Sequence, residues 1–162
     1  MKFSMKEVVD IAIGIEESGY YFYTQCRSRF DNRELGDLLV FLATEELRHK
    51  EIFEKMLREI KDKEGLYSED YYKYLKAIGD SRVFKDNSDV DRVVMGIKEI
   101  ADVFKIAIAA EKDSILWYSE LLAMYKKENE PLSVLTKLID EERKHIIILL
   151  NLKEKMGLGN NQ

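Results

Sequence analysis

The only two histidines of the chain each follow a glutamate at a spacing of three residues. Glu46 and His49 lie in the segment 42–49, Glu142 and His145 lie in 138–145, and both segments are apolar at helical intervals. Residues three apart on a helix are surface neighbours with Cβ atoms about 5–6 Å apart, so each pair could chelate one ion. One such pair on a charged helix is usually a solvated pair. Its repetition, with no other histidine present, favours metal ligation.

A second repeat adds two more carboxylates. Glu16 and Glu111 are each followed, at the same offsets, by a small residue, a large aromatic residue and a tyrosine. Nearly the same interval separates Glu16 from Glu46 and Glu111 from Glu142. Each repeat therefore predicts a helical hairpin, and the two hairpins together would bring four glutamates and two histidines into one place. The alternative is that Glu16 and Glu111 are ordinary surface residues of their helices, but both lie within apolar stripes.

Charge supports a metal site. Four buried carboxylates without a cation would each cost several kcal/mol in desolvation and mutual repulsion. Two divalent ions would balance that charge. Oxygen and imidazole ligands without thiolate suit iron or manganese, and zinc can also bind such a set.

Four long helices must position these side chains. The chain has 162 residues, 46% of them apolar, with one proline and eight glycines, which predicts a single helical domain. We expect helices at about 4–30, 32–63, 89–127 and 130–156, and a crossover at 64–88 that contains one short helix. Two hairpins joined by a long crossover give an all-α, ferritin-like four-helix bundle rather than a simple up-down bundle.

Several helix ends carry local signals. Ser4 with Glu7 forms a capping-box pattern, and Asp31 or Asn32 can cap the second helix with Glu34 as the reciprocal partner. The remaining signals are Gly65 and Gly79 as stops, Ser88 to Asp91 as the start of the third long helix, and Pro131 at the first position of the fourth.

Composition excludes several classes of protein. The net charge of −5 comes from 31 acidic and 26 basic residues mixed along the chain, which argues against a nucleic-acid surface. No run of eighteen apolar residues and no signal-peptide pattern occurs, so we expect a cytoplasmic protein without a membrane span. Cys26 is the only cysteine, which rules out iron held by several thiolates and favours a buried apolar role for this thiol.

Four motifs in order resemble the rubrerythrin family of ferritin-like di-iron proteins. They are Glu16-x-x-Gly19-x-x-Phe22-Tyr23, Leu42-Ala43-x-Glu45-Glu46-x-x-His49, Glu111-Lys112-Asp113-Ser114-Ile115-x-x-Tyr118 and Glu141-Glu142-x-x-His145. The likeness covers about residues 5–155. The segment from Tyr74 to Phe84 is also similar to the crossover of single-domain family members.

The resemblance implies a di-iron centre that reduces hydrogen peroxide, or oxidises ferrous iron, with external electrons. Carried over by position, the ligands of two iron ions per chain would be Glu16, Glu46, His49, Glu111, Glu142 and His145. Spacing alone leaves Glu45 and Glu141 open as histidine partners, whereas family position makes them exposed or outer groups. The family also implies a homodimer and, because this chain has one cysteine, an external electron donor such as a rubredoxin. An additional ligand common in the family is replaced by Ser114 here.

Tyr23 and Tyr118 are expected to support the site. Each lies two helical turns, about 10.5 Å along the axis, from the glutamate of its own helix and cannot reach it. We therefore expect each phenol to donate a hydrogen bond to a carboxylate ligand on another helix. The alternative is a pair of core aromatic residues whose hydroxyls reach backbone or water.

Two other functions remain open from the sequence. The first is an iron-binding or storage-like module without significant turnover, which needs the same ligands. The second is a metal-free helical interaction protein, whose partner surface would be the crossover tyrosines Tyr67, Tyr71, Tyr72 and Tyr74. Tyrosines in such a segment are more often half-buried packing residues.

Overall fold

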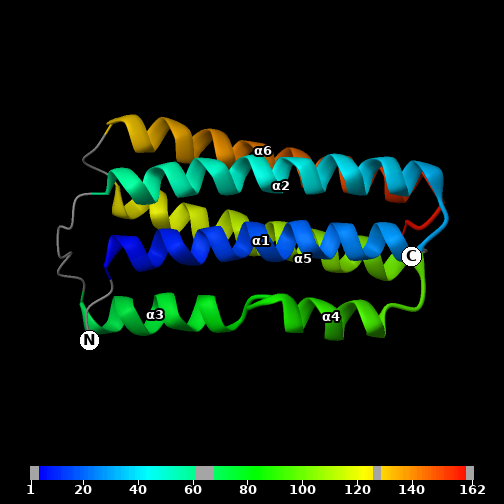
Figure 1. The fold of residues 1–162 in the computed structure, drawn as a ribbon, viewed down its shortest axis with the longest axis horizontal. Coiled ribbons are helices and arrows are strands. Elements are labelled where there is room, and N and C mark those ends of the chain that lie inside the picture. Colours follow the sequence, from blue (N-terminus) through cyan, green and yellow to red (C-terminus); the bar gives the residue numbers. More distant parts are fainter. Residues whose placement is uncertain (1–3, 61–67, 126–128, 160–162) are drawn as a thin grey trace.

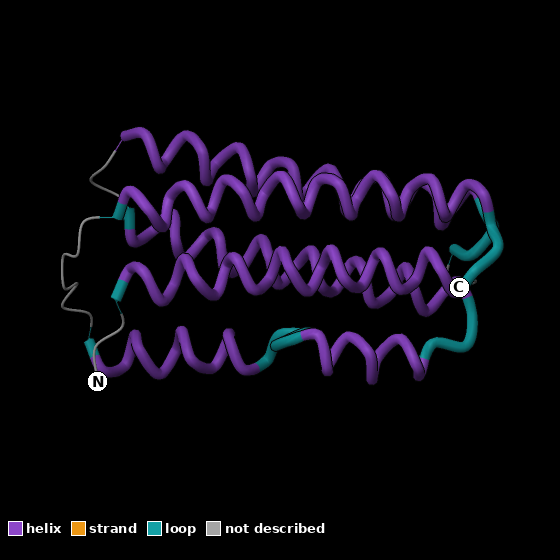
Figure 2. The backbone as a smooth tube through the Cα atoms, viewed as in Figure 1, coloured by secondary structure: helices purple, strands orange, loops and turns teal. Residues whose placement is uncertain are grey.

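The computed structural model describes residues 4–60, 68–125 and 129–159, and every regular element in these ranges is a helix (Figures 1 and 2). The helices are α1 (Met5–Arg29), α2 (Arg33–Glu59), α3 (Glu69–Asp80), α4 (Asn87–Gly96), α5 (Ile100–Met124) and α6 (Asn129–Lys155). None of these described helices is long and apolar enough to cross a bilayer.

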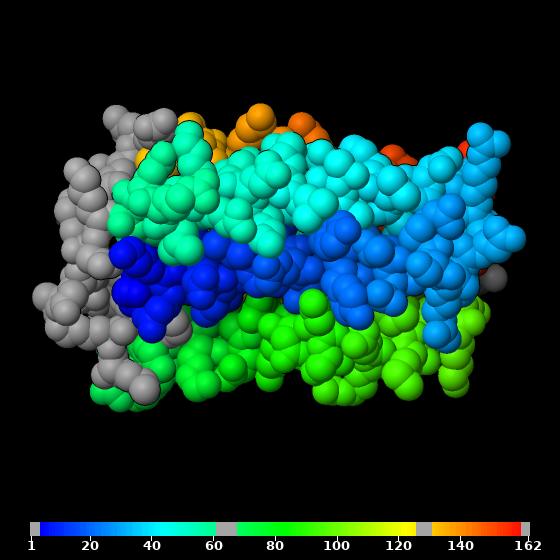
Figure 3. Space-filling model, in the orientation of Figure 1, coloured from blue at the N-terminus to red at the C-terminus, as the bar shows by residue number. Residues whose placement is uncertain are grey.

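Two antiparallel hairpins form the bundle. α1 packs against α2, α5 packs against α6, and the hairpins meet through α1 with α5 and α2 with α6. α3 and α4 follow one another along the outside of the bundle, from one end to the other, and α4 packs against α1 (Figure 1). In Figure 3, α1 lies between α2 and the α3–α4 pair on the face shown. The predicted all-α bundle of two hairpins with a long crossover is confirmed.

The first helix begins as predicted, and the second differs in detail. The Ser4 hydroxyl accepts from the Glu7 amide at 3.2 Å, and the Glu7 carboxylate accepts from the Ser4 amide at 2.7 Å. Asn32 caps α2 by accepting from the Leu35 amide at 2.9 Å. Because Asn32 rather than Asp31 is the cap, Glu34 lies one position too early to complete a capping box. It pairs instead with Lys155 at 2.8 Å.

Other boundaries move by a few residues. α2 ends at Glu59 rather than near residue 63, and the stop expected at Gly65 lies outside the described residues. The short crossover helix is present as α3, with Gly79 in its last turn. α6 begins at Asn129, so Pro131 is the third helical residue rather than the first. The backbone amides of a first turn lack intrahelical partners, so proline is tolerated there as well.

The third long helix was predicted wrongly. Residues 89–127 are not one helix, because α4 ends at Gly96 and α5 starts at Ile100 in the opposite direction (Figure 1). Ile97 is extended, with φ −68° and ψ 124°, and its carbonyl accepts from Arg29 at 2.7 Å. The Asp102 carboxylate accepts from the amides of Lys98 and Glu99 at 2.9 and 3.2 Å, which fixes the start of α5. The crossover therefore extends to residue 99.

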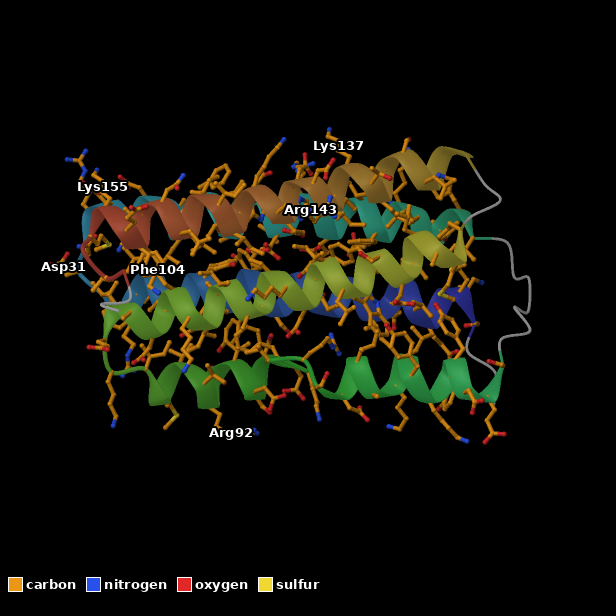
Figure 4. All side chains as sticks on the ribbon, turned by 180° about the vertical axis from the view of Figure 1, so that it is seen from behind. Asp31, Arg92, Phe104, Lys137, Arg143 and Lys155 are labelled. Atoms are coloured by element: carbon orange, nitrogen blue, oxygen red, sulfur yellow. The ribbon has the colours of Figure 1, made fainter. Side chains whose placement is uncertain are left out.

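The apolar core has two parts. One cluster includes Phe22, Leu39 and Phe104, and Phe104 is seen between the helices in Figure 4, whereas Lys137 and Lys155 point outward. The other cluster includes Val8, Phe53, Leu121 and Leu138. Along each helix of the two hairpins, the buried charged residues lie between the stretches that form these clusters. The bundle therefore encloses a polar layer between two apolar ones.

Two smaller expectations concern single residues. Cys26 is fully buried, and burial raises the pKa of its thiol to about 12, in agreement with an apolar role. The hydroxyls of Tyr71 and Tyr74 both donate to Glu120 of α5 at 2.9 Å, so these tyrosines attach α3 to the bundle. Tyr67 lies outside the described residues.

Candidate metal centre

The polar layer contains all six residues predicted as metal ligands. α1 supplies Glu16, α2 supplies Glu46 and His49, α5 supplies Glu111, and α6 supplies Glu142 and His145. Each of the six is at most 3% exposed. The apolar clusters on both sides explain this burial, because each helix places its acid or its Glu-x-x-His pair at the same level of the bundle.

Both imidazoles turn their Nδ1 atoms toward carboxylates. Nδ1 of His49 lies 2.9 Å from Glu142 and 3.7 Å from Glu16. Nδ1 of His145 lies 2.8 Å from Glu142 and 3.6 Å from Glu111. The two rings stack with centroids 5.6 Å apart and an interplanar angle of 14°. Glu142 thus lies between the two histidines.

The donor atoms form two overlapping groups of four. In each group one atom from every residue lies within 4.8 Å of the others, which is the spacing of ligands around a single ion. The groups are Glu16, Glu46, His49 and Glu142, and Glu46, Glu111, Glu142 and His145. Because Glu46 and Glu142 belong to both groups, each could serve as a ligand at either position.

Buried polar atoms without hydrogen-bond partners indicate whether the layer suits a metal ion. Four buried atoms of these residues have no hydrogen-bond partner: one oxygen each of Glu16, Glu46 and Glu142, and Nδ1 of His145. His145 Nδ1 is only 2.8 Å from Glu142 Oε2, yet the two do not form a hydrogen bond. Buried polar atoms are nearly always paired, so a cluster of lone pairs directed at shared space fits a cation.

The protonation of the layer is strongly perturbed without a cation. Burial, followed by repulsion from Glu142, raises the pKa of Glu16 to about 7 and that of Glu111 to about 8. Burial and then Glu16 raise the pKa of Glu46 well above its usual range. The carboxylates therefore resist sharing this volume as anions, and a divalent ion would remove that repulsion.

Glu142 and the histidines show the opposite balance. Burial opposes ionisation of Glu142, but the adjacent imidazoles of His145 and His49 outweigh it and lower its pKa to about 2. Burial also disfavours charged imidazoles, yet the neighbouring carboxylates raise the pKa of His49 to about 8 and that of His145 to about 10. In the absence of a metal, protonated imidazoles therefore provide the positive charge that the carboxylates require.

Two tyrosines cross between the hairpins. The Tyr23 hydroxyl of α1 donates to Glu111 of α5 at 2.5 Å, and the Tyr118 hydroxyl of α5 donates to Glu16 of α1. Both tyrosines are buried. The expectation that each phenol reaches a carboxylate on another helix is confirmed.

The two glutamates of each adjacent pair, 45/46 and 141/142, have different surroundings. Glu46 and Glu142 point into the polar layer, whereas Glu45 and Glu141 lie outside it with side chains 23% and 18% exposed. Arg48 links the outer pair, with a guanidinium nitrogen 3.0 Å from Glu45 and 2.6 Å from Glu141. Sequence spacing left this choice open, and its resolution depends on the rotation of each helix about its axis.

Gly19 is a residue whose importance was not argued from the sequence. A Cβ at this position would lie 2.5 Å from Oε2 of Glu46, so only glycine leaves room for that carboxylate. The signal was present as the small residue of the α1 repeat, whose counterpart in α5 is Ser114. Ser114 is buried, and its hydroxyl donates to the Ala110 carbonyl at 3.3 Å.

A small cavity adjoins the layer on this side. Its volume is about 20 Å³, enough for about one water molecule, and it is lined in part by Gly19, Glu46, Glu111 and Ser114. Arg82, from the segment between α3 and α4, also lines it and donates to the Gly79 carbonyl at 3.0 Å. Nothing in the spacing of the sequence connects Arg82 to the site, because the contact depends on how the crossover lies over α5.

Comparison with known proteins agrees with this geometry. A family model described as Rubrerythrin matches residues 7–94. A solved structure described as that of a ferritin-like diiron-carboxylate protein from Thermotoga maritima is 28% identical, with a TM-score of 0.70, and the match covers 96% of this chain and 97% of that one. No curated protein matches the chain. The family match spans the first hairpin and most of the crossover, and the structural match extends over both hairpins.

Proposed function

This chain belongs to the rubrerythrin family, and from that premise we propose that it is a di-iron oxidoreductase that reduces hydrogen peroxide with electrons from a separate donor. The observation that carries the proposal is the pair of overlapping donor groups that share Glu46 and Glu142. Two ions held by shared carboxylates lie close enough to act on one small molecule together. Oxygen and imidazole donors without thiolate favour iron or manganese over softer sites.

The six donors would hold the ions, with Glu16 and His49 available to one, Glu111 and His145 to the other, and Glu46 and Glu142 to either. When bound there, iron supplies the two electrons needed to cleave the peroxide O–O bond. With two protons, the products are two water molecules. A ferritin-like centre of this composition could also oxidise ferrous iron with oxygen, and the experiment below distinguishes the two activities.

The protein's own residues orient the ligands and restrict access. Burial, followed by the charge of Glu111, raises the pKa of Tyr23 well above its usual range. Burial and then Glu16 do the same for Tyr118. Both phenols therefore stay protonated and keep donating to their carboxylates, which fixes the direction of the remaining lone pairs. The cavity beside Ser114 has room for about one water-sized molecule, so only a small oxidant could approach the donors from this side.

An external donor is part of the proposal. A rubredoxin-type iron needs four thiolates, and Cys26, the single cysteine of the sequence, is buried in the core. Electrons would therefore enter from another molecule, such as a rubredoxin. We also propose a homodimer, because Val40, Leu47 and Ile147 expose apolar side chains on α2 and α6 that a second copy would cover.

The test is metal analysis followed by rapid mixing. Protein reconstituted with ferrous iron under anaerobic conditions should bind two ions per chain and be oxidised rapidly by hydrogen peroxide. Rapid oxidation by oxygen with slow reaction toward peroxide would indicate a ferroxidase instead. Two bound ions with neither reaction would indicate an iron-binding module. Fewer than one ion per chain would contradict the metal centre and leave a helical interaction protein.

A further inference from the structure

We propose that the two metal positions are unequal, and that Glu141 makes the position of His49 the tighter one. This inference rests on the proposed metal centre. Nε2 of His49 lies 3.2 Å from Oε2 of Glu141, across the interface between α2 and α6. In the part of the chain that the structure describes, His145 has no such carboxylate on its Nε2, and its ring meets the edge of Phe41 at 6.1 Å and 85°.

Metal binding decides which nitrogen of His49 carries the proton. Nδ1 faces Glu142 and Glu16, so an ion in the layer would take the lone pair of that atom. The proton must then be on Nε2, where it is donated to Glu141. A carboxylate that accepts this proton fixes the tautomer and the ring orientation and makes the imidazole a more basic ligand. Glu141 is thus a positioning residue that acts on the metal through His49.

Arg48 keeps Glu141 in place. Its guanidinium lies 2.6 Å from Glu141 and is also held by Glu45 at 3.0 Å. The same nitrogen is 3.1 Å from Nε2 of His49, so the guanidinium, Nε2 and the Glu141 carboxylate lie in one group. When an ion takes Nδ1, Nε2 becomes a donor, and Glu141 is the acceptor that both groups then share.

The sequence repeat shows why the second histidine lacks this arrangement. Glu45 and Glu141 occupy equivalent positions of the two hairpins, but the residue before the histidine is Arg48 in the first and Lys144 in the second. Lys144 is exposed, and no described hydrogen bond joins Glu45 to either imidazole. The planar guanidinium can hold two carboxylates at once, which a lysine ammonium does with less directional precision.

The test is a titration of the metal-free protein with Co²⁺, followed by visible absorption and calorimetry. The wild type should bind in a tight step and a weaker step. Glu141→Gln, which keeps the shape and an acceptor oxygen but removes the charge, should weaken the tight step by about tenfold or more. Asp140→Asn is the matched control, because it removes the carboxylate next to Glu141 that bonds Arg143 rather than Arg48, and it should leave both steps unchanged.

Two further measurements assign the steps. His49→Ala should remove the tight step and His145→Ala the weak one. In proton NMR spectra of the wild type with Co²⁺, one shifted imidazole N–H should exchange slowly with solvent, and it should be lost or exchange rapidly in Glu141→Gln. A merely structural role of Glu141 would not change the exchange of that proton.

The outcomes separate this inference from the metal centre itself. Two equal steps that Glu141→Gln leaves unchanged would overturn the inequality while leaving a two-metal site. Loss of the tight step in His145→Ala rather than His49→Ala would reverse the assignment and contradict the role of Glu141. Protein that binds no Co²⁺ would contradict the metal centre, and the inference with it.

Discussion

The Tyr23 hydroxyl lies 2.5 Å from Oε1 of Glu111, so a side chain of the first hairpin orients a carboxylate of the second. Tyr118 makes the reciprocal contact with Glu16. The two bonds join α1 and α5 at the level of the buried acids, and neither tyrosine belongs to the two donor groups. Orientation of the ligands can therefore be altered without removing a ligand.

Tyr23→Phe and Tyr118→Phe should fold and still bind two metals, because the ring remains to fill the core. Loss of the phenol hydrogen bond should lower the rate of reaction with peroxide by about tenfold. Stopped-flow mixing with hydrogen peroxide checks the rate, and metal analysis checks occupancy. Tyr71→Phe, which removes a hydroxyl bonded to Glu120 far from the donors, is the control. Unchanged rates in both variants would show that the phenols serve packing alone.

Glu46→Gln should reduce binding of both ions, because Glu46 belongs to both donor groups. Glu45→Gln should bind two ions, since Glu45 is bonded to Arg48 outside the polar layer. Metal analysis after anaerobic reconstitution compares the two variants. Retention of two ions by Glu46→Gln with loss in Glu45→Gln would reverse the assignment of Glu45 and Glu46.

Gly19→Ala should impair the site more than the fold. The added methyl group would lie 2.5 Å from Oε2 of Glu46, so this carboxylate must shift from the position that it takes in both donor groups. Gly14→Ala is the matched control on the same helix, because a Cβ there meets nothing within 4 Å. It should stabilise the protein by about 0.5–1 kcal/mol through reduced backbone entropy in the unfolded chain. Metal titration and thermal unfolding measure the two effects, and equal metal binding by both variants would contradict the close approach.

The metal-free protein should become less stable as pH rises. The pKa values of Glu16 and Glu111 are raised to about 7 and 8, and those of His49 and His145 to about 8 and 10. A raised pKa means that the folded state holds its proton more tightly, so the stabilisation is complete below the unfolded value and is lost through the folded one. Glu142, whose pKa is lowered to about 2, contributes a constant amount above pH 5.

Thermal unfolding of the metal-free protein between pH 5 and pH 9 checks this sign. The unfolding temperature should fall across the range, and metal-loaded protein should lose that dependence, because ions bind the deprotonated donors. Glu111→Gln should flatten part of the metal-free curve. A metal-free unfolding temperature that rises between pH 6 and pH 9 would contradict the raised pKa values.

The helices that bear the ligands were predictable because their apolar spacing and the repeated Glu-x-x-His pattern agree. The start of α5 was not, because apolar residues continue at helical spacing through Ile97 into Ile100 while the chain reverses direction. The spacing of apolar residues shows which face of a helix is buried, but not where the chain reverses. Both α4 and α5 bury an apolar face, so the pattern continues across the break between them. The unequal surroundings of His49 and His145 were also invisible, since they depend on which side chains α2 and α6 bring together at their interface.

The crossover has a mechanical consequence. α3 and α4 run the length of the bundle. The two hairpins are therefore connected covalently only through this one long crossover (Figure 1). Each donor group takes three residues from one hairpin and a single glutamate, Glu142 or Glu46, from the other. A bound ion would therefore be held by residues of both hairpins and would link the two halves of the molecule. Metal binding would hold the two hairpins together. After removal of the metal by a chelator, side-chain packing, the two tyrosine hydrogen bonds and the polar contacts of α2 with α6, such as Arg48 with Glu141, would hold them.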